Sequence, residues 1–208
     1  ENTSSQKSRI LANKTRIAFG MSHKQYRKTL SMLRKRINVL ERLMSAGKWD
    51  EIEFDKIPSK AGLIYKNAFA RRDIIKAKYE KFAKDENTKV NAGTLYPYEI
   101  VQKYIGSRWG WNHIHQEVAS IEAMWKNLPD YVDNINGLVV ADTSGSMWGQ
   151  PLQVSISLAL YIAERNKNEV FKNYFITFDE RPQLQEVKGD SLKERICNLK
   201  EINASNTD

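Results

Sequence analysis

A short polar loop places one carboxylate and two hydroxyls at alternate positions. Asp142, Ser144 and Ser146 follow the apolar run 137–141, and Gly145 permits an unusual backbone path between them. Oxygen donors of this kind suit Mg²⁺, which prefers octahedral coordination and keeps several of its waters; Mn²⁺ and Ca²⁺ are alternatives. Because only one carboxylate is present, the bound ion would keep a net positive charge and attract an outside carboxylate. The spacing therefore predicts a cation site that binds rather than catalyses.

The elements around this loop predict the opening of an α/β domain. The run 137–141 shows no polar alternation, which is typical of a strand buried on both faces of a parallel sheet. We expect an apolar helix from Pro151 to about residue 165, a second strand over 174–178, a return strand over 183–187 and a final helix opened by the Ser191–Glu194 capping box. In a doubly wound sheet, ligands gather beyond the carboxyl ends of the strands, and the polar loop falls there.

The first 130 residues show helical spacing and no strand pattern. Tyr26, Leu30, Leu33 and Ile37 recur at alternating intervals of four and three, which predicts one face of a long amphipathic helix. Helices are expected over residues 22–46, 59–84, 97–105 and 111–125. We therefore divide the chain into an all-helical module, residues 1–130, and an α/β part, residues 131–208.

The two parts differ in charge. Residues 1–135 contain 25 Lys and Arg against 15 Asp and Glu, whereas residues 136–208 contain 8 against 10. A basic helical module could attract structured RNA or another acidic partner; the alternative is a basic surface that is only solvated. The candidate nucleic-acid contacts are basic residues of the first two expected helices: Lys24, Arg27, Lys28, Arg34, Lys35, Arg36, Arg71, Arg72, Lys76 and Lys78.

The stretch Asp-Thr-Ser-Gly-Ser at 142–146 resembles the metal-ion-dependent adhesion site of von Willebrand factor A (vWA) domains. The resemblance implies a Rossmann-like, doubly wound fold and a divalent cation held for binding a protein partner through an exposed carboxylate. It also implies a threonine ligand from a second loop, and Thr207 stands at the matching position. The family's third loop would lie beyond residue 208, so we expect the first part of a vWA domain, truncated at the C-terminus.

A second resemblance covers the chain from about residue 20. Tyr-Arg-Lys-Thr-Leu-Ser at 26–31, Ala-Gly-Thr-Leu-Tyr-Pro-Tyr-Glu-Ile at 92–100 and the stretch 142–152 are similar to an uncharacterised family, domain of unknown function 2828, with members in plants, giant viruses and phages. That family is similar in plan to the TROVE proteins of the Ro autoantigen group, which join an RNA-binding helical repeat module to a vWA domain. The resemblance implies an RNA-binding function for the helical module, although no RNA-contact motif is shared.

Other functions find little support in the sequence. There is no phosphate-binding loop, and Ser144 and Ser146 do not stand in a nucleophile elbow, so a metal-dependent hydrolase is the least favoured of three hypotheses. His113 and His115 are two residues apart on an expected helix and point in different directions, so they are no zinc pair. The chain lacks a long apolar stretch and a signal peptide, and has one cysteine, Cys197, which together favour a cytoplasmic protein without membrane contact. We expect a non-enzymatic interaction protein; RNA binding is the alternative.

Overall fold

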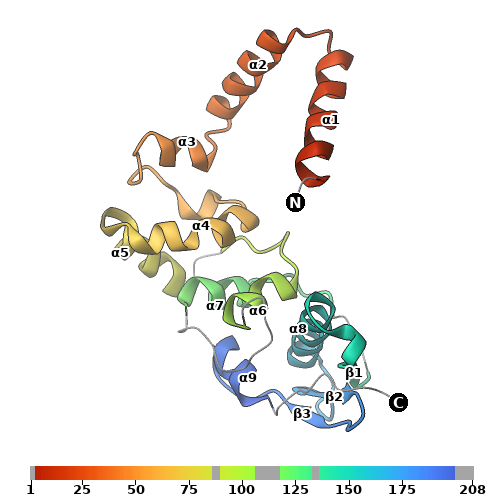
Figure 1. The fold of residues 1–208 in the computed structure, drawn as a ribbon. Helices are drawn as coiled ribbons and strands as arrows, with labels where there is room; N and C mark the ends of the chain where they lie inside the picture. The colour runs from red at the N-terminus through yellow and green to blue at the C-terminus, as the bar shows by residue number, and fades with distance from the viewer. Residues whose placement is uncertain (1–2, 86–89, 106–117, 133–135, 200–208) are drawn as a thin grey trace. The chain divides into compact units, whose positions relative to one another are not determined.

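The protein is seen here as a computed structural model. It describes residues 3–85, 90–105, 118–132 and 136–199. The chain forms two compact units, residues 1–52 and residues 53–208. The described part of the first unit is helical, and that of the second combines helices with a small sheet (Figure 1).

The first unit contains three helices: α1 (Thr3–Ala18), α2 (His23–Arg36) and α3 (Leu40–Ser45). Helix α2 begins close to the predicted position. A capping box opens it: the Ser22 hydroxyl accepts a hydrogen bond from the backbone N–H of Gln25, and the Gln25 side chain accepts one from the Ser22 backbone. The single helix expected over 22–46 is wrong, since the chain turns at Asn38 with φ of 47°. Asparagine tolerates this left-handed conformation, while the apolar spacing continues across the break and gives no sign of it.

Helix α2 leaves its apolar face largely uncovered. None of its residues is buried, and Leu33 keeps 44% of its surface exposed. Ile37, which caps the helix, is 69% exposed. The spacing correctly predicts a helix with one apolar face, but that face is not core in this structure.

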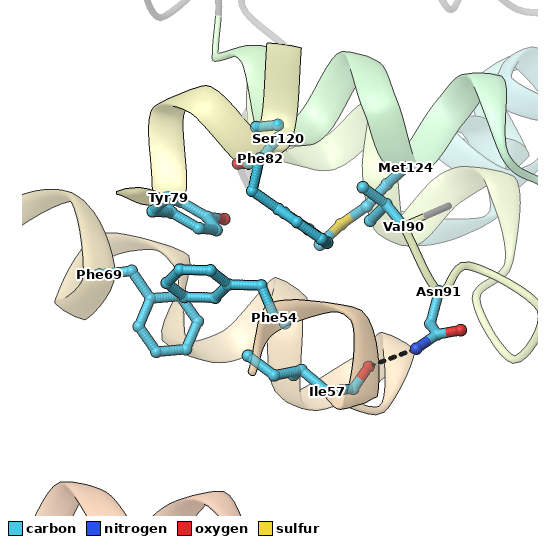
Figure 2. A pocket seen from close by; sticks show the side chains of 11 residues that line it. Phe54, Ile57, Phe69, Tyr79, Phe82, Val90, Asn91, Ser120 and Met124 are labelled. Atoms are coloured by element: carbon cyan, nitrogen blue, oxygen red, sulfur yellow. Dashed lines mark hydrogen bonds between the residues drawn. The ribbon is translucent and has the colours of Figure 1, made fainter. Parts of the chain in front are cut away.

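The second unit begins with helices: η1 (Phe54–Lys56), α4 (Ser59–Arg71), α5 (Asp73–Lys84), α6 (Pro97–Ile105) and α7 (Ala119–Lys126). The helix expected over 59–84 is two helices, because Arg72 adopts an extended conformation between α4 and α5. Phe69 is fully buried at this corner and packs edge-on against Tyr79 and Phe54, around a cavity of about 20 Å³ (Figure 2). The break folds α5 back so that both helices share these aromatic rings.

The α/β part follows in the same unit: β1 (Val139–Asp142), η3 (Gly145–Met147), α8 (Gln150–Arg165), β2 (Tyr174–Phe178), β3 (Leu184–Glu186) and α9 (Leu192–Asn198). The strand order is β1-β2-β3, with β1 and β2 parallel and β2 and β3 antiparallel. The Ser191–Glu194 capping box opens α9. The predicted strand–helix–strand unit with its return strand is confirmed as a mixed α/β arrangement.

Helix α8 lies between the sheet and helix α6. Its residues Leu152, Ile156 and Leu160 are fully buried, and one continuous core runs from Leu63 in α4 to Leu199 after α9. Helices α6 and α7, which the sequence groups with the helical module, therefore pack directly on the α/β part. This packing fixes α8, and with it the loop that joins β1 to α8.

Candidate metal site at the carboxyl end of the sheet

The polar loop forms a compact set of oxygen atoms where β1 ends. Asp142 is the last residue of the strand, and its Oδ1 accepts a hydrogen bond of 3.0 Å from the backbone N–H of Ser144. The hydroxyl oxygens of Ser144 and Ser146 lie 3.1 Å apart. Ser144 is buried, whereas Asp142 and Ser146 are exposed. Three of the four predicted ligands are thus brought together, and the fourth, Thr207, lies outside the described residues.

Thr143 anchors this loop to the neighbouring strand. Its side chain is fully buried, and its backbone N–H donates a hydrogen bond of 3.0 Å to the carbonyl of Phe178 at the end of β2. Its hydroxyl donates a hydrogen bond of 2.8 Å to Oδ2 of Asp179. These hydrogen bonds and the burial of Thr143 hold the loop between Asp142 and Ser144 against the end of β2.

Asp179 is a second carboxylate at this edge of the sheet, in the turn that follows β2. Asp142 pairs with Phe178 in the parallel register of β1 and β2, so Asp179 follows one residue beyond that pair. A signal was present in the sequence: each aspartate directly follows an apolar strand, and parallel strands end at the same edge of a sheet. The local charge is therefore more negative than Asp142 alone implies.

The donor set fits a hard cation. A carboxylate and two hydroxyls are the ligands that Mg²⁺ accepts when it keeps several waters. Asp142 also lines an open hollow of about 560 Å³ between β1 and the start of α8, which gives an outside group access to the loop. Within the described ranges no three His, Cys, Asp or Glu side chains gather to hold a metal, so a site here depends on the serine hydroxyls.

The other residues considered in the sequence are exposed or lie outside the described residues. Trp148, which follows the metal loop in the chain, is 61% exposed. His113 and His115 lie outside the described residues. The ten basic candidates are all exposed, six of them on α2 and four at the α4–α5 corner and on α5: Lys24, Arg27, Lys28, Arg34, Lys35, Arg36, Arg71, Arg72, Lys76 and Lys78.

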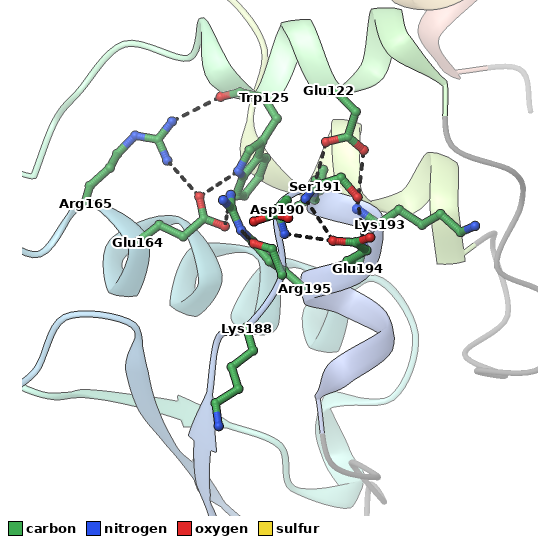
Figure 3. Close-up of polar contacts among 12 residues, drawn as sticks. Glu122, Trp125, Glu164, Arg165, Lys188, Asp190, Ser191, Lys193, Glu194 and Arg195 are labelled. Carbon is green, nitrogen blue, oxygen red and sulfur yellow. Dashed lines mark hydrogen bonds and ion pairs between the residues drawn. The ribbon is translucent and has the colours of Figure 1, made fainter.

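Two glutamates that the sequence analysis did not single out join the helices to the α/β part (Figure 3). Glu122 of α7 accepts hydrogen bonds from the backbone N–H groups of Leu192 (2.7 Å) and Lys193 (3.3 Å) at the start of α9. It also accepts one from the hydroxyl of Tyr104 in α6. The carboxylate thus satisfies helix-terminal donors that α9 cannot satisfy within itself.

Glu164 makes the second connection, from near the end of α8. Its carboxylate accepts a hydrogen bond of 2.8 Å from the indole N–H of Trp125 in α7 and pairs with Arg195 of α9 at 3.2 Å. Arg165 is a more distant partner at 3.8 Å. Burial raises the pKa of Glu164 above its ordinary value, and the neighbouring Arg195, Trp125 and Arg165 offset this in part. Both glutamates serve the packing that positions α8.

These features define a mixed α/β protein with an oxygen-rich loop where its first strand ends. The chain belongs to the family described as Domain of unknown function (DUF2828), which matches residues 2–136. A second family, Domain of unknown function (DUF7788), matches residues 136–208. The change from one family to the other falls three residues before β1 begins at Val139.

The chain is similar to the protein called Uncharacterized protein L728 of Acanthamoeba polyphaga mimivirus. The two are 35% identical over 202 residues, which covers 90% of this chain and 34% of the viral protein. The chain therefore spans about a third of that relative's length. No solved structure matches the chain. Among the helices described, none is long and apolar enough to cross a membrane.

Proposed function

We propose that this protein is a non-enzymatic binding protein that uses a divalent cation to hold an acidic partner. The observation that carries the proposal is the convergence of oxygen atoms from Asp142, Ser144 and Ser146 at the carboxyl end of β1, beside an open hollow. Their order in the chain is that of the vWA adhesion site, and the strand–helix–strand unit around them is compatible with the start of a vWA domain. Thr207 is proposed as the further ligand.

The chemistry of the site favours binding through charge. Mg²⁺ held by one carboxylate and neutral hydroxyls keeps a net positive charge, so a carboxylate of the partner is attracted to an open coordination position. Asp142 would supply the charge, and Ser144 and Ser146 would orient the ion. Asp179 would hold the loop through Thr143 rather than contact the ion.

Removing the single ligand carboxylate tests this proposal. We expect Asp142→Ala to abolish Mg²⁺ or Mn²⁺ binding measured by calorimetry while the thermal unfolding curve stays close to wild type, because Asp142 is exposed. Glu169→Ala is the matched control, since it removes an exposed carboxylate from the turn between α8 and β2. Equal cation affinity in the Asp142 variant and wild type would refute the proposal.

RNA binding by the helical module is a second candidate function. Residues 2–40 contain ten Lys and Arg and no Asp or Glu, and the six basic candidates on α2 are all exposed. Phosphate groups are attracted to such a surface whatever their sequence, and the affinity falls steeply as salt rises. No residue of α2 is buried, so packing within the first unit does not explain the composition of this helix.

A further inference from the structure

Helix α2 and its cap carry a narrow apolar stripe that is open along much of its length. The stripe consists of Tyr26, Leu30, Leu33 and Ile37, which follow one another at intervals of four, three and four residues. Tyr26 and Leu30 are partly buried, whereas Leu33 and Ile37 keep 44% and 69% of their surfaces exposed. A stripe with this alternation is typical of a helix that pairs lengthwise with another helix, as in a coiled coil.

The positions that flank this stripe are mostly basic. When Leu30 is placed at heptad position a and Leu33 at position d, Arg27 and Arg34 occupy the flanking e positions and Arg36 occupies a flanking g position. In the part of the chain that the structure describes, none of these arginines has an ion-pair partner. Side chains at e and g positions decide which helix is accepted as a partner, so α2 favours a helix with carboxylates there.

Charge and the width of the stripe distinguish between the possible occupants. The same helix of a second copy would be repelled, because α2 contains six Lys and Arg residues and no acidic residue. A lipid surface takes up a broad apolar face, whereas this stripe has only the width of a coiled-coil seam. RNA would use the arginines but would leave Leu33 and Ile37 in water. An acidic amphipathic helix uses both the charge and the stripe.

We infer that α2 docks lengthwise against an amphipathic helix of a partner protein, with an aliphatic seam flanked by Asp or Glu. Leu33 and Ile37 are buried against that seam, and the arginines at the flanking positions face its carboxylates. This contact needs neither the cation at Asp142 nor RNA, so it goes beyond both proposed functions.

A designed peptide tests the inference by fluorescence anisotropy with the whole chain. The labelled probe has about three heptads with isoleucine at a, leucine at d and glutamate at e and g, and the control peptide has lysine at e and g. We expect the glutamate peptide to bind with an affinity that falls as salt rises, and the lysine peptide not to bind.

Two neighbouring substitutions test the stripe itself. Leu33→Gln should weaken binding of the glutamate peptide at least about tenfold, because the buried leucine side chain is lost from the seam. Met32→Gln is the matched control, since Met32 is 63% exposed on the same helix but lies outside the stripe, and it should bind as wild type does. Glutamine is a good helix former, so circular dichroism should show unchanged helix content in both variants.

Several outcomes would overturn the inference. It is wrong if wild type does not bind the glutamate peptide at low salt, if both peptides bind equally well, or if both variants lose the same affinity. Vesicles of phosphatidylserine and phosphatidylcholine, a structured RNA and sedimentation of the chain alone test the other occupants. If Leu33→Gln abolishes lipid binding, RNA binding or self-association while Met32→Gln does not, the stripe belongs to that occupant instead. Calorimetry with Mg²⁺ tests the metal site separately, and a failure of either idea leaves the other unaffected.

Discussion

Asp179 accepts a hydrogen bond of 2.8 Å from the hydroxyl of Thr143, across the ends of two parallel strands. Thr143 stands between two of the candidate metal ligands, Asp142 and Ser144, and its side chain is fully buried. The carboxylate of Asp179 therefore holds the metal loop through the side chain of Thr143. The position of the candidate ligands depends on β2 as well as on β1. Partners of this kind orient the groups that contact a metal and commonly affect its affinity.

Substitutions of Asp179 separate orientation from charge. We expect Asp179→Ala to weaken Mg²⁺ binding about tenfold or more, because the hydroxyl of Thr143 loses its acceptor and the loop loses its anchor. Asp179→Asn keeps an acceptor for Thr143 and should retain most of the affinity. Calorimetric titration of both variants with Mg²⁺ gives the comparison. If the two variants bind equally weakly, the charge of Asp179 matters more than its hydrogen bond, and the positioning role is wrong.

The sequence predicts local features well and distant ones poorly. The capping box at Ser191 and the strand–helix–strand unit with its return strand follow from short patterns, and both are found. The sequence does not predict the breaks at Asn38 and Arg72, because an apolar period can continue through a single residue of non-helical conformation. The contact of Glu122 with the start of α9 spans 70 residues and leaves no local trace in the sequence.

The same limit applies to the candidate site. Asp142, Ser144 and Ser146 could be found because a loop of five residues carries them all. Asp179 belongs to a different strand end, and its place beside Thr143 depends on the parallel register of β1 with β2. Its position after an apolar strand is a sequence signal for the same sheet edge, but the contact with Thr143 itself depends on how the strands pair.

Glu122 should be important for stability. Glu122→Ala leaves the backbone N–H groups of Leu192 and Lys193 without their acceptor in a partly buried place, and Tyr104 loses its partner. We expect the free energy of unfolding to fall by roughly 2 kcal/mol, the usual scale for a lost helix cap with an unsatisfied donor. Chemical denaturation followed by circular dichroism measures this change.

The control for Glu122 is a substitution that keeps one of its two acceptor oxygens. Glu122→Gln retains one carbonyl oxygen and should lose less stability than Glu122→Ala. An unfolding free energy for Glu122→Ala within about 0.5 kcal/mol of wild type, the range of ordinary surface substitutions, would contradict the proposed role.

Glu164 should make the folded state less stable as the pH rises. Burial raises its pKa in the folded protein above the ordinary 4.5, so the folded state holds the proton more tightly than the unfolded state does. This contribution to stability is therefore full below pH 4.5 and is lost as the pH rises through the raised pKa. Glu164→Gln removes the titration and keeps an acceptor for the indole N–H of Trp125.

The measurement is the difference in unfolding free energy between wild type and Glu164→Gln across that pH range. We expect the difference to shift in favour of the glutamine variant as the pH rises above 4.5, and then to level off. Glu169→Gln, which changes an exposed glutamate in the same way, is the matched control. A difference that is constant with pH, or that shifts toward wild type, would show that the ion pairs with Arg195 and Arg165 outweigh burial.

The basic face of α2 is tested by charge reversal. Replacing Arg34, Lys35 and Arg36 with glutamate should weaken binding to a structured RNA well over tenfold at moderate salt, because three attractive contacts with phosphate become repulsive. These residues form the last turn of α2, where negative charge opposes the helix dipole, so a glutamine version shows how much of any loss comes from the helix itself. The control reverses three exposed charges of the α/β part: Lys167, Lys172 and Arg181. Gel-shift titrations at two salt concentrations measure the RNA affinity of each variant. Equal loss of affinity in both charge-reversed variants would show that net charge, rather than the α2 surface, governs binding.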